Sequence, residues 1–203
     1  NAIPQLFVPN ILSFATEGKE FFYGSVRCPL ELWSPWRLDS EDEELVQKLG
    51  LKEVGKELNQ ILQPSVLLEI MQNFSLFSSD KKKRRIKIIP RYQQYDGANK
   101  IVDRVLDGTI KQGLIWHFQG SGKSLLMVFA AQKLRRHPGL KSPTVVILVD
   151  RIDLDTQLTG TFNAADVSNL VAVDSIHELN DLLEKDTRKI LITTIHKFKD
   201  ATE

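Results

Sequence analysis

The sequence lacks the features that mark several classes of protein. It has a single cysteine, Cys28, among 203 residues, which excludes an internal disulfide framework and any metal site built only from cysteines. Its apolar runs are far shorter than the roughly 20 residues that a membrane-spanning helix needs. No positively charged and then apolar leader opens the chain, so we expect no secretory signal, no membrane partner and a reducing, cytoplasmic location.

An excess of either charge is also missing, because 27 Lys and Arg residues face 26 Asp and Glu residues. Apolar residues make up 42% and charged residues 26%, which is ordinary for a soluble globular protein and excludes disordered, collagen-like and coiled-coil chains. The charges are unevenly spread, with an acidic cluster at residues 39–44 and a basic cluster at 81–87. A solvated surface is the default interpretation of the basic cluster, and contact with a phosphate backbone stays open as the alternative.

Three stretches of the sequence differ in composition and in hydrophobic periodicity. Residues 1–37 are rich in Phe, Leu, Pro and Trp and predict a β-hairpin around a turn at 16–19. Residues 38–88 show partial helical periodicity and then a polar, basic connector at 75–87. From residue 89 onward, helical and strand patterns alternate.

This alternation predicts the fold class. The predicted helices lie at 91–106, 122–136, 154–162 and 176–183, and the predicted strands at 114–116, 144–149, 170–173 and 189–195. Such a pattern is typical of an α/β fold whose parallel sheet is covered by helices on both faces. Ligands of such a sheet bind at the carboxyl ends of its strands.

The strongest motif lies between a predicted strand and a predicted helix, at Gly120-Ser121-Gly122-Lys123-Ser124. Glycines there allow backbone N–H groups to turn toward phosphate oxygens, and the start of the helix adds favourable dipole charge. Lys123 would then reach the β- and γ-phosphates, and the hydroxyl of Ser124 would bind Mg²⁺. The usual first glycine of such a loop is His117 here, and a plain turn with a surface lysine is the alternative.

A second candidate lies upstream, in Arg91-Tyr92-Gln93-Gln94-Tyr95. The side-chain amide of Gln94 can donate to and accept from an adenine edge at once. Taken alone, this element is better explained as a polar helix start whose tyrosines pack inward.

Together these motifs resemble the motor (R) subunit of type I restriction enzymes, which are superfamily 2 helicase-like DNA translocases fused to a nuclease domain. The resemblance is carried by Arg91-x-x-Gln94, the loop at 113–124, the segment at 149–158 and Thr193-Thr194-Ile195-His196-Lys197-Phe198. It covers residues 90–203 well, whereas the likeness of Ile3 to Phe7 and the following hairpin to the end of a nuclease domain is far less specific.

The resemblance implies a domain organisation. Residues 1–37 would be the C-terminal part of an endonuclease-like domain, and 38–88 a helical linker with a basic run. Residues 89–203 would be the first RecA-like, ATP-binding lobe, ending before the Asp-Glu-Ala-His box that completes the site. We therefore expect this chain alone to hydrolyse ATP poorly.

The resemblance also implies roles for individual residues. The ATP-binding set is Gln94, Gln119, Gly120, Ser121, Gly122, Lys123 and Ser124, with Lys123 and Ser124 acting in catalysis and Ser124 on Mg²⁺. The DNA-binding set is Arg151, Gln157, Thr193, Thr194 and Lys197. An exposed helix start equally explains Arg151, and a β-favouring pair equally explains the two threonines.

The implied function is ATP-driven translocation on duplex DNA before cleavage, with ATP and Mg²⁺ as cofactors. The implied partners are the methylation (M) and specificity (S) subunits, in the cytoplasm of a prokaryote. Another superfamily 2 helicase, a kinase or other P-loop ATPase, and a non-catalytic nucleotide-binding module are the alternatives. Glu17-Gly18-Lys19 has the spelling of a nuclease motif, but no aspartate precedes Asp39, so we predict a turn there.

Overall fold

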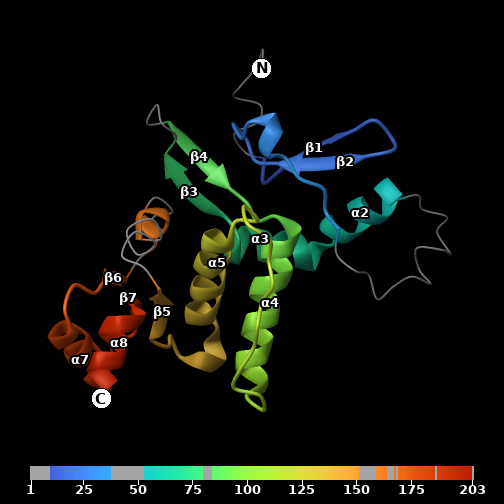
Figure 1. The fold of residues 1–203 in the computed structure, drawn as a ribbon. Helices are drawn as coiled ribbons and strands as arrows, with labels where there is room; N and C mark the ends of the chain where they lie inside the picture. Colours follow the sequence, from blue (N-terminus) through green and yellow to red (C-terminus); the bar gives the residue numbers. More distant parts are fainter. Residues whose placement is uncertain are drawn as a thin grey trace. The chain divides into compact units, whose positions relative to one another are not determined.

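A computed structural model of the chain describes residues 10–37, 53–79, 84–150, 159–163, 167, 169–185 and 187–202. The chain divides into two compact units, Asn1–Gly97 and Ala98–Glu203. Each unit is described separately below, and Figure 1 shows their elements.

The first unit opens with the predicted hairpin. Strands β1 (Ser13–Thr16) and β2 (Phe21–Gly24) pair antiparallel, with Thr16 opposite Phe21 next to the turn. Gly18 lies in this turn with φ +92°, a backbone conformation that glycine adopts without steric cost. The hydroxyl of Thr16 donates to the carbonyl of Glu20 at 2.6 Å and accepts from the Gly18 N–H at 3.0 Å. The turn predicted for Glu17-Gly18-Lys19 is therefore present.

A short 3-10 helix, η2 (Leu30–Leu32), follows this hairpin, and the helices α2 (Glu53–Ile61) and α3 (Pro64–Asn73) come after it. The polar connector predicted at 75–87 is wrong, because a second antiparallel hairpin forms there from β3 (Leu76–Ser79) and β4 (Arg85–Ile88). The sequence of β4 alternates charged and apolar residues, which is the period-two pattern of a strand. This alternation was missed in the sequence because the neighbouring lysines favoured a polar connector.

The core of the first unit is a chain of aromatic rings from separate elements. Tyr23, Trp36 and Phe74 are almost completely buried, and Tyr95 is 8% exposed. Ring centroids are 5.4 Å apart for Tyr23 and Trp36, 5.2 Å for Trp36 and Tyr95, and 4.9 Å for Phe74 and Tyr95. Tilted and edge-to-face pairs at such distances add to the stability that burial provides. This cluster joins β2 and α3 to the first turn of α4 (Tyr92–Asp107).

The second unit contains the parallel sheet. Its remaining elements are α5 (Lys123–Arg136), η3 (Pro138–Leu140), β5 (Val145–Val149), β6 (Leu170–Ala172), α7 (Ile176–Glu184), β7 (Ile190–Thr194) and α8 (Ile195–Thr202). The strand order is β5-β7-β6, and every pairing is parallel. All residues of the central strand β7 are buried, so both of its faces are covered. The mixed α/β fold with a parallel sheet is therefore confirmed, and it is consistent with a RecA-like lobe.

Helices α7 and α8 pack on this sheet around Val173, Leu179 and Leu191, with Phe198 against them. The start of α7 is fixed by a capping box. The Ser175 hydroxyl accepts from the Glu178 N–H at 3.1 Å, and the Glu178 carboxylate accepts from the Asp174 N–H at 3.0 Å. None of the helices in the described part of the chain combines the length and apolarity needed to cross a bilayer.

The strand predicted at 114–116 is wrong. These residues have no regular structure, and Leu114 and Trp116 are each 87% exposed. A short apolar segment becomes a strand only by pairing with a neighbour, and none of the strands that the structure describes pairs with it. The strand predicted at 189–195 ends one residue early, since α8 begins at Ile195. Residues 159–163 are helical, and the rest of the helix predicted at 154–162 lies outside the described residues.

One buried hydrogen bond should contribute measurably to the first unit. The Tyr23 hydroxyl donates to the carbonyl of Pro90 at 2.6 Å, and burial raises the pKa of Tyr23, so the phenol remains a donor at physiological pH. We predict that Tyr23→Phe lowers the stability of this unit by about 1–3 kcal/mol, because a buried carbonyl loses its donor. Urea unfolding of the full-length protein, followed by tryptophan fluorescence, measures this. Tyr92→Phe, at a half-buried position, is the control, and equal effects of both variants would contradict the prediction.

Candidate nucleotide-binding site

The predicted phosphate loop has the backbone that its glycines allow. Gly120 and Gly122 both have φ +84°, in the left-handed region that glycine adopts without steric cost. A Cβ added at Gly120 would meet nothing within 4 Å, so the loop is open on that side. Gly122 is also the N-cap of α5, and no side chain caps this helix. The first N–H groups of α5 therefore start beside an open loop, as an anion site requires.

Lys123 folds back over this loop. Its ammonium donates to the carbonyl oxygens of Phe118 at 3.0 Å and His117 at 3.3 Å. These bonds are solvent-exposed, so a multiply charged anion competes well for the ammonium. Ser121 is fully buried and its N–H donates to the Phe118 carbonyl at 3.3 Å, which closes the turn. The open side, the helix start and the positioned ammonium together fit a phosphate chain.

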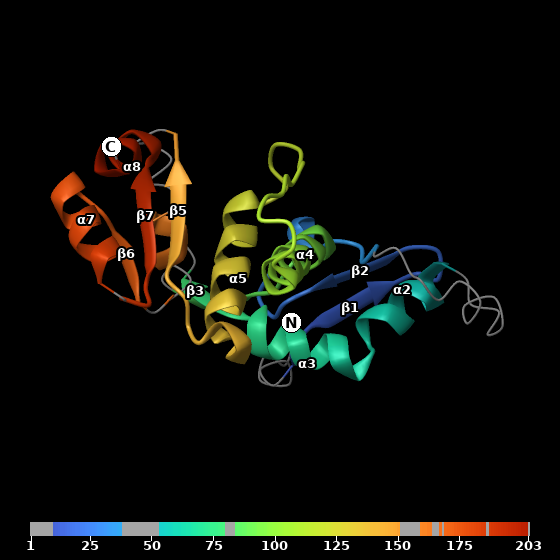
Figure 2. The same cartoon turned by 90° about the horizontal axis from the view of Figure 1, so that it is seen from below.

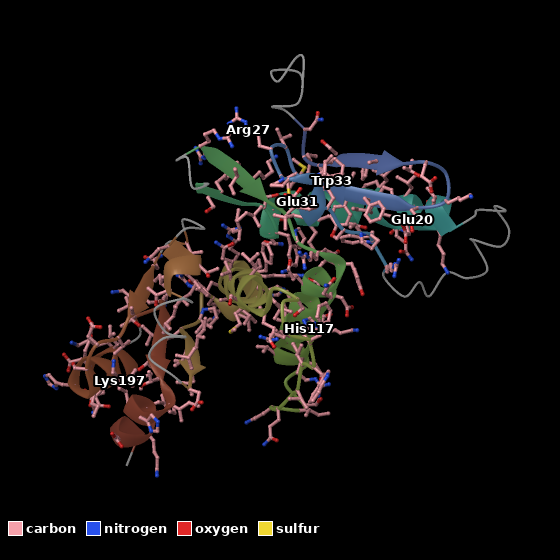
Figure 3. The ribbon with its side chains drawn as sticks, turned by 45° about the horizontal axis from the view of Figure 1, so that its top comes forward. Glu20, Arg27, Glu31, Trp33, His117 and Lys197 are labelled. Carbon is pink, nitrogen blue, oxygen red and sulfur yellow. The ribbon has the colours of Figure 1, made fainter. Side chains whose placement is uncertain are left out.

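The two polar residues that flank the loop differ in exposure. Gln119 is exposed, whereas Ser124 lies half-buried in the first turn of α5. His117 stands at the position of the usual first glycine and is half-buried (Figure 3). Its Nδ1 has no hydrogen-bond partner among the described residues. In the part of the chain that the structure describes, His, Cys, Asp and Glu form no group of three or more that could hold a metal ion. The Mg²⁺-binding role of Ser124 stays a prediction.

Gln94 belongs to the first unit and is 2% exposed. Its side-chain oxygen accepts from the Arg91 N–H at 2.8 Å. A glutamine that reaches back to the start of its own helix in this way completes half of a capping box. This bond fixes the first turn of α4, and the adenine-binding role of Gln94 stays a prediction.

The residues predicted to contact DNA fall into two groups. Thr193 and Thr194 end β7 and are 0% and 4% exposed. Lys197 lies in the first turn of α8, and its ammonium donates to the carbonyl of Val173 at 3.0 Å. The structure thus brings these three together at the carboxyl end of the sheet, where Figure 3 labels Lys197. Arg151 and Gln157 lie outside the described residues. The DNA-binding roles of all five residues stay predictions.

The phosphate loop and the ends of the strands share one end of the second unit. Helix α5 runs away from its N-terminus and β5 returns in the opposite direction (Figure 2). The start of α5 is therefore at the same end of the unit as the carboxyl ends of β5 and β7. This is the end of an open parallel sheet where ligands bind.

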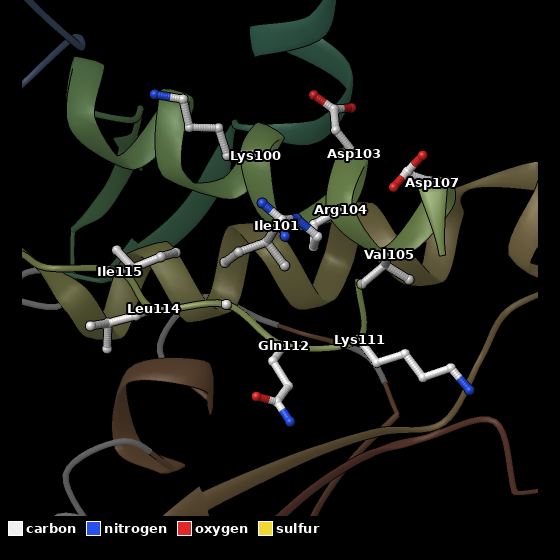
Figure 4. Close-up of a pocket in the computed structure, with 11 residues that line it drawn as sticks. Lys100, Ile101, Asp103, Arg104, Val105, Asp107, Lys111, Gln112, Leu114 and Ile115 are labelled. Carbon is white, nitrogen blue, oxygen red and sulfur yellow. The ribbon is translucent and has the colours of Figure 1, made fainter. Parts of the chain in front are cut away.

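Two hollows among the described residues of the second unit were not predicted from the sequence. A groove of about 830 Å³ runs between α4 and residues 111–115 (Figure 4). Ile101, Val105 and Leu114 are among its lining residues, and Lys100, Arg104 and Lys111 add charge. No residue of the predicted nucleotide or DNA set lines it. The helical stripe containing Ile101 and Val105 was its only signal, and an apolar stripe normally indicates a packed face.

The second hollow, of about 200 Å³, is polar and includes Gln132, Arg135 and Arg136 from the end of α5. Burial lowers the pKa of Arg135, whose guanidinium donates to the Ser142 hydroxyl at 3.3 Å. In the sequence these arginines were indistinguishable from the cations that commonly end a helix.

The positive φ of Gly120 can be tested by substitution. We predict that Gly120→Ala weakens nucleotide binding and lowers stability by about 1–2 kcal/mol, because an alanine disfavours a left-handed conformation. Open space around Gly120 means that only the backbone is strained. Titration with a fluorescent ATP analogue and thermal unfolding of the full-length protein measure both effects. Gly113→Ala is the matched control, since that glycine also has open space and lacks a positive φ. Comparable losses in both variants would exclude the proposed cause.

The hydrogen bond from Lys197 to the Val173 carbonyl should contribute measurably to stability. We predict that Lys197→Met destabilises the packing of α8 by about 1.5–3 kcal/mol, the usual range for hydrogen bonds to charged groups. Hydrogen exchange of the β6 and α8 amides reports this loss locally. Lys185→Met removes an exposed lysine that is 3.5 Å from Asp181 and should change little. Unchanged protection in Lys197→Met would show that the bond to Val173 adds no stability.

Comparison with known proteins shows similarity to an ATPase family and to restriction endonuclease subunits. Residues 93–203 match the SWI2/SNF2 ATPase family. The type I restriction enzyme HindI endonuclease subunit of Haemophilus influenzae is 35% identical over 97% of this chain and 19% of its own length. The putative type I restriction enzyme MjaIXP endonuclease subunit of Methanocaldococcus jannaschii is 29% identical over 97% of this chain and 20% of its own length.

A shorter match reaches another bacterium. The type I restriction enzyme SsaAORF53P endonuclease subunit of Staphylococcus saprophyticus is 34% identical over 47% of this chain and 10% of its own length. The chain thus spans about one fifth of the length of the relatives that it matches along almost all of its residues. These matches confirm the resemblance to type I restriction endonuclease subunits, and the family match over residues 93–203 shows that the chain belongs to the SWI2/SNF2 ATPase family.

Proposed function

We propose that this chain is the nucleotide-binding part of the motor of a type I restriction enzyme. In this proposal it binds ATP with Mg²⁺ and duplex DNA, and hydrolysis drives translocation before cleavage. The observation that carries the proposal is the open glycine loop with Lys123 over it, at the start of α5, in a chain of the SWI2/SNF2 ATPase family.

The proposal extends to domains and partners. Residues 1–37 would end an endonuclease-like domain, 38–88 would be a linker, and 89–203 would form the first ATP-binding lobe. Matches along 97% of the chain to two endonuclease subunits support continuity of these parts in one protein. The M and S subunits would be its partners in the cytoplasm of a prokaryote.

Each residue of the loop would contact a different part of the bound ATP and Mg²⁺. Backbone N–H groups near Gly120 and Gly122 turn to the phosphate oxygens, and Gln119 and Ser121 complete the loop. Lys123 moves its ammonium from the Phe118 and His117 carbonyls to the phosphates. Ser124 offers its hydroxyl to Mg²⁺. ATP with Mg²⁺, when bound, supplies the phosphoryl transfer that powers the motor.

The other predicted residues connect the loop to its substrates. Gln94 would meet the adenine edge while its oxygen keeps the start of α4 in place. Thr193 and Thr194, with Arg151 and Gln157, would contact the DNA backbone. Lys197 joins this group, and its bond to Val173 holds α8 against the end of β6.

The decisive variant is Lys123→Ala in the full-length protein assembled with the M and S subunits. We predict that ATP hydrolysis is strongly stimulated by long duplex DNA in the wild type. The variant should lose roughly 100-fold or more of this rate, because a preorganised charge on the transferred phosphoryl group is missing. Lys185→Ala removes an exposed lysine directly after α7 and should retain the full rate.

Other outcomes would select the alternatives. Full activity in Lys123→Ala, or no effect of duplex DNA on the wild type, would reject the motor. Phosphoryl transfer to a small acceptor without any need for DNA would indicate a kinase. A loss of stability in Lys123→Ala with no change in turnover would indicate a non-catalytic nucleotide-binding module.

A further inference from the structure

The β3–β4 hairpin of the first unit has no role in the proposed motor site. Its second strand carries the end of the basic run, and Arg84 and Arg85 are exposed where β4 begins. Ser79 lies opposite Arg85 at this end of the hairpin. Residues 80–83, Asp80-Lys81-Lys82-Lys83 in sequence, connect the two strands and lie outside the described residues.

Arg85 is held in position by an aromatic ring. Its guanidinium carbon lies 4.5 Å from the centre of the Phe77 ring on the neighbouring strand, and Phe77 is itself 41% exposed. A guanidinium stacked in this way keeps its N–H edge open and loses less freedom when it binds an anion. Arg85 therefore presents a partly ordered donor fork to solvent.

Arg27 brings a third guanidinium to the same place. Its Nη1 donates to the carbonyl of Arg85 at 3.4 Å, and Figure 3 shows Arg27 beside this hairpin. No ion pair joins Arg27 or Arg85 to a carboxylate within the described residues. Arg27, Arg84 and Arg85, called here the arginine edge, form a cluster of positive charge. At Arg27 and Arg85 this charge is not neutralised by a carboxylate of the described residues.

Lys87 behaves differently although it belongs to the same run. It is half-buried, and its ammonium donates to the carbonyl of Asn10 at 2.9 Å. Its ammonium thus connects Asn10 to β4. The basic run is therefore divided into a structural lysine and an exposed edge, which a uniformly solvated charge cluster would not show.

We propose that the arginine edge binds the phosphate backbone of duplex DNA, as a contact separate from the motor lobe. Duplex DNA carries a negative charge about every 1.7 Å of its axis, so a few closely spaced arginines release several counterions on binding. The arginine fork matches phosphate oxygens bidentately. The contact is independent of base sequence, because charge and reach suffice for it.

This inference rests on the proposed function, since it assumes a DNA substrate. It adds a holding contact outside the ATP-binding lobe, which would retain the duplex while the lobe changes its grip. Such a contact affects affinity and salt dependence and leaves the ATPase rate at saturating DNA unchanged.

The test uses the full-length protein and a fluorescein-labelled duplex of mixed sequence, with binding followed by anisotropy over a series of KCl concentrations. Arg84→Ala/Arg85→Ala should weaken binding about tenfold near ~0.1 M salt and lower the slope of log affinity against log salt by about 2. Arg84→Lys/Arg85→Lys keeps the charge and should recover most of the affinity. Arg27→Asn, chosen because Arg27 has φ +67° and asparagine tolerates that region, should lower the slope by about 1.

Lys19→Ala is the matched control, because Lys19 is an exposed cation on the turn of the other hairpin in the same unit, and it should bind duplex like the wild type. Thermal unfolding of each variant checks the fold. If the Ala double variant is unstable, Arg84→Gln/Arg85→Gln removes the same charges with longer side chains and should show the same loss of affinity, about tenfold, and wild-type affinity and slope in that folded variant would overturn the phosphate contact. A Lys double variant that folds but binds no better than the Ala double variant would overturn the phosphate contact.

The failure of this inference can be told apart from failure of the motor. Wild-type affinity and slope in the folded Ala double variant, with Lys123→Ala still inactive, would overturn the arginine edge alone. Absence of duplex binding in the wild type would overturn both. Normal duplex binding with lost assembly onto the M and S subunits would show a protein contact and would also overturn the inference.

Discussion

The complete burial of β7 is the constraint on which the second unit depends. Every residue of this strand is buried, so its polar backbone must be satisfied by neighbours on both sides. The parallel pairings place Val149 opposite Thr194 and Ala172 opposite Ile192, which sets the ends of all three strands nearly level. The strand offers almost no accessible surface along its length, so we expect ligands at its carboxyl end, where Thr193 and Thr194 lie, and at the loops beyond it.

Local signals in the sequence predicted much of the fold. The helix predicted at 176–183 is present as α7, Ile176–Glu184, and α5 begins directly after Gly122 as the loop motif requires. Two elements were mispredicted for different reasons. The segment at 114–116 has the composition of a strand but no partner among the described strands, and pairing is a non-local property. The β3–β4 hairpin was masked by charge, although its alternation was present.

For the candidate site, the sequence identified residue types better than it identified their bonds. The loop glycines have the left-handed backbone that their predicted role demands. The bond that Gln94 accepts from the Arg91 N–H is local, but its spacing was not used to predict it from the sequence. The bond that Lys197 donates to the Val173 carbonyl depends on the distance between two segments after folding, and no sequence pattern predicts it. Both bonds give motif residues a structural role.

The resting position of Lys123 has a consequence for the energetics of ligand exchange. Its ammonium is already bonded to the carbonyls of Phe118 and His117, so an incoming anion replaces existing bonds and adds few new ones. The net affinity is then a difference between two bonded states, and it is smaller than the contacts in the filled loop suggest. A singly charged ion such as chloride gains little from this exchange, whereas a polyphosphate gains at several atoms at once. In the proposed function, the loop would thus select anions by their charge before any contact with the base forms.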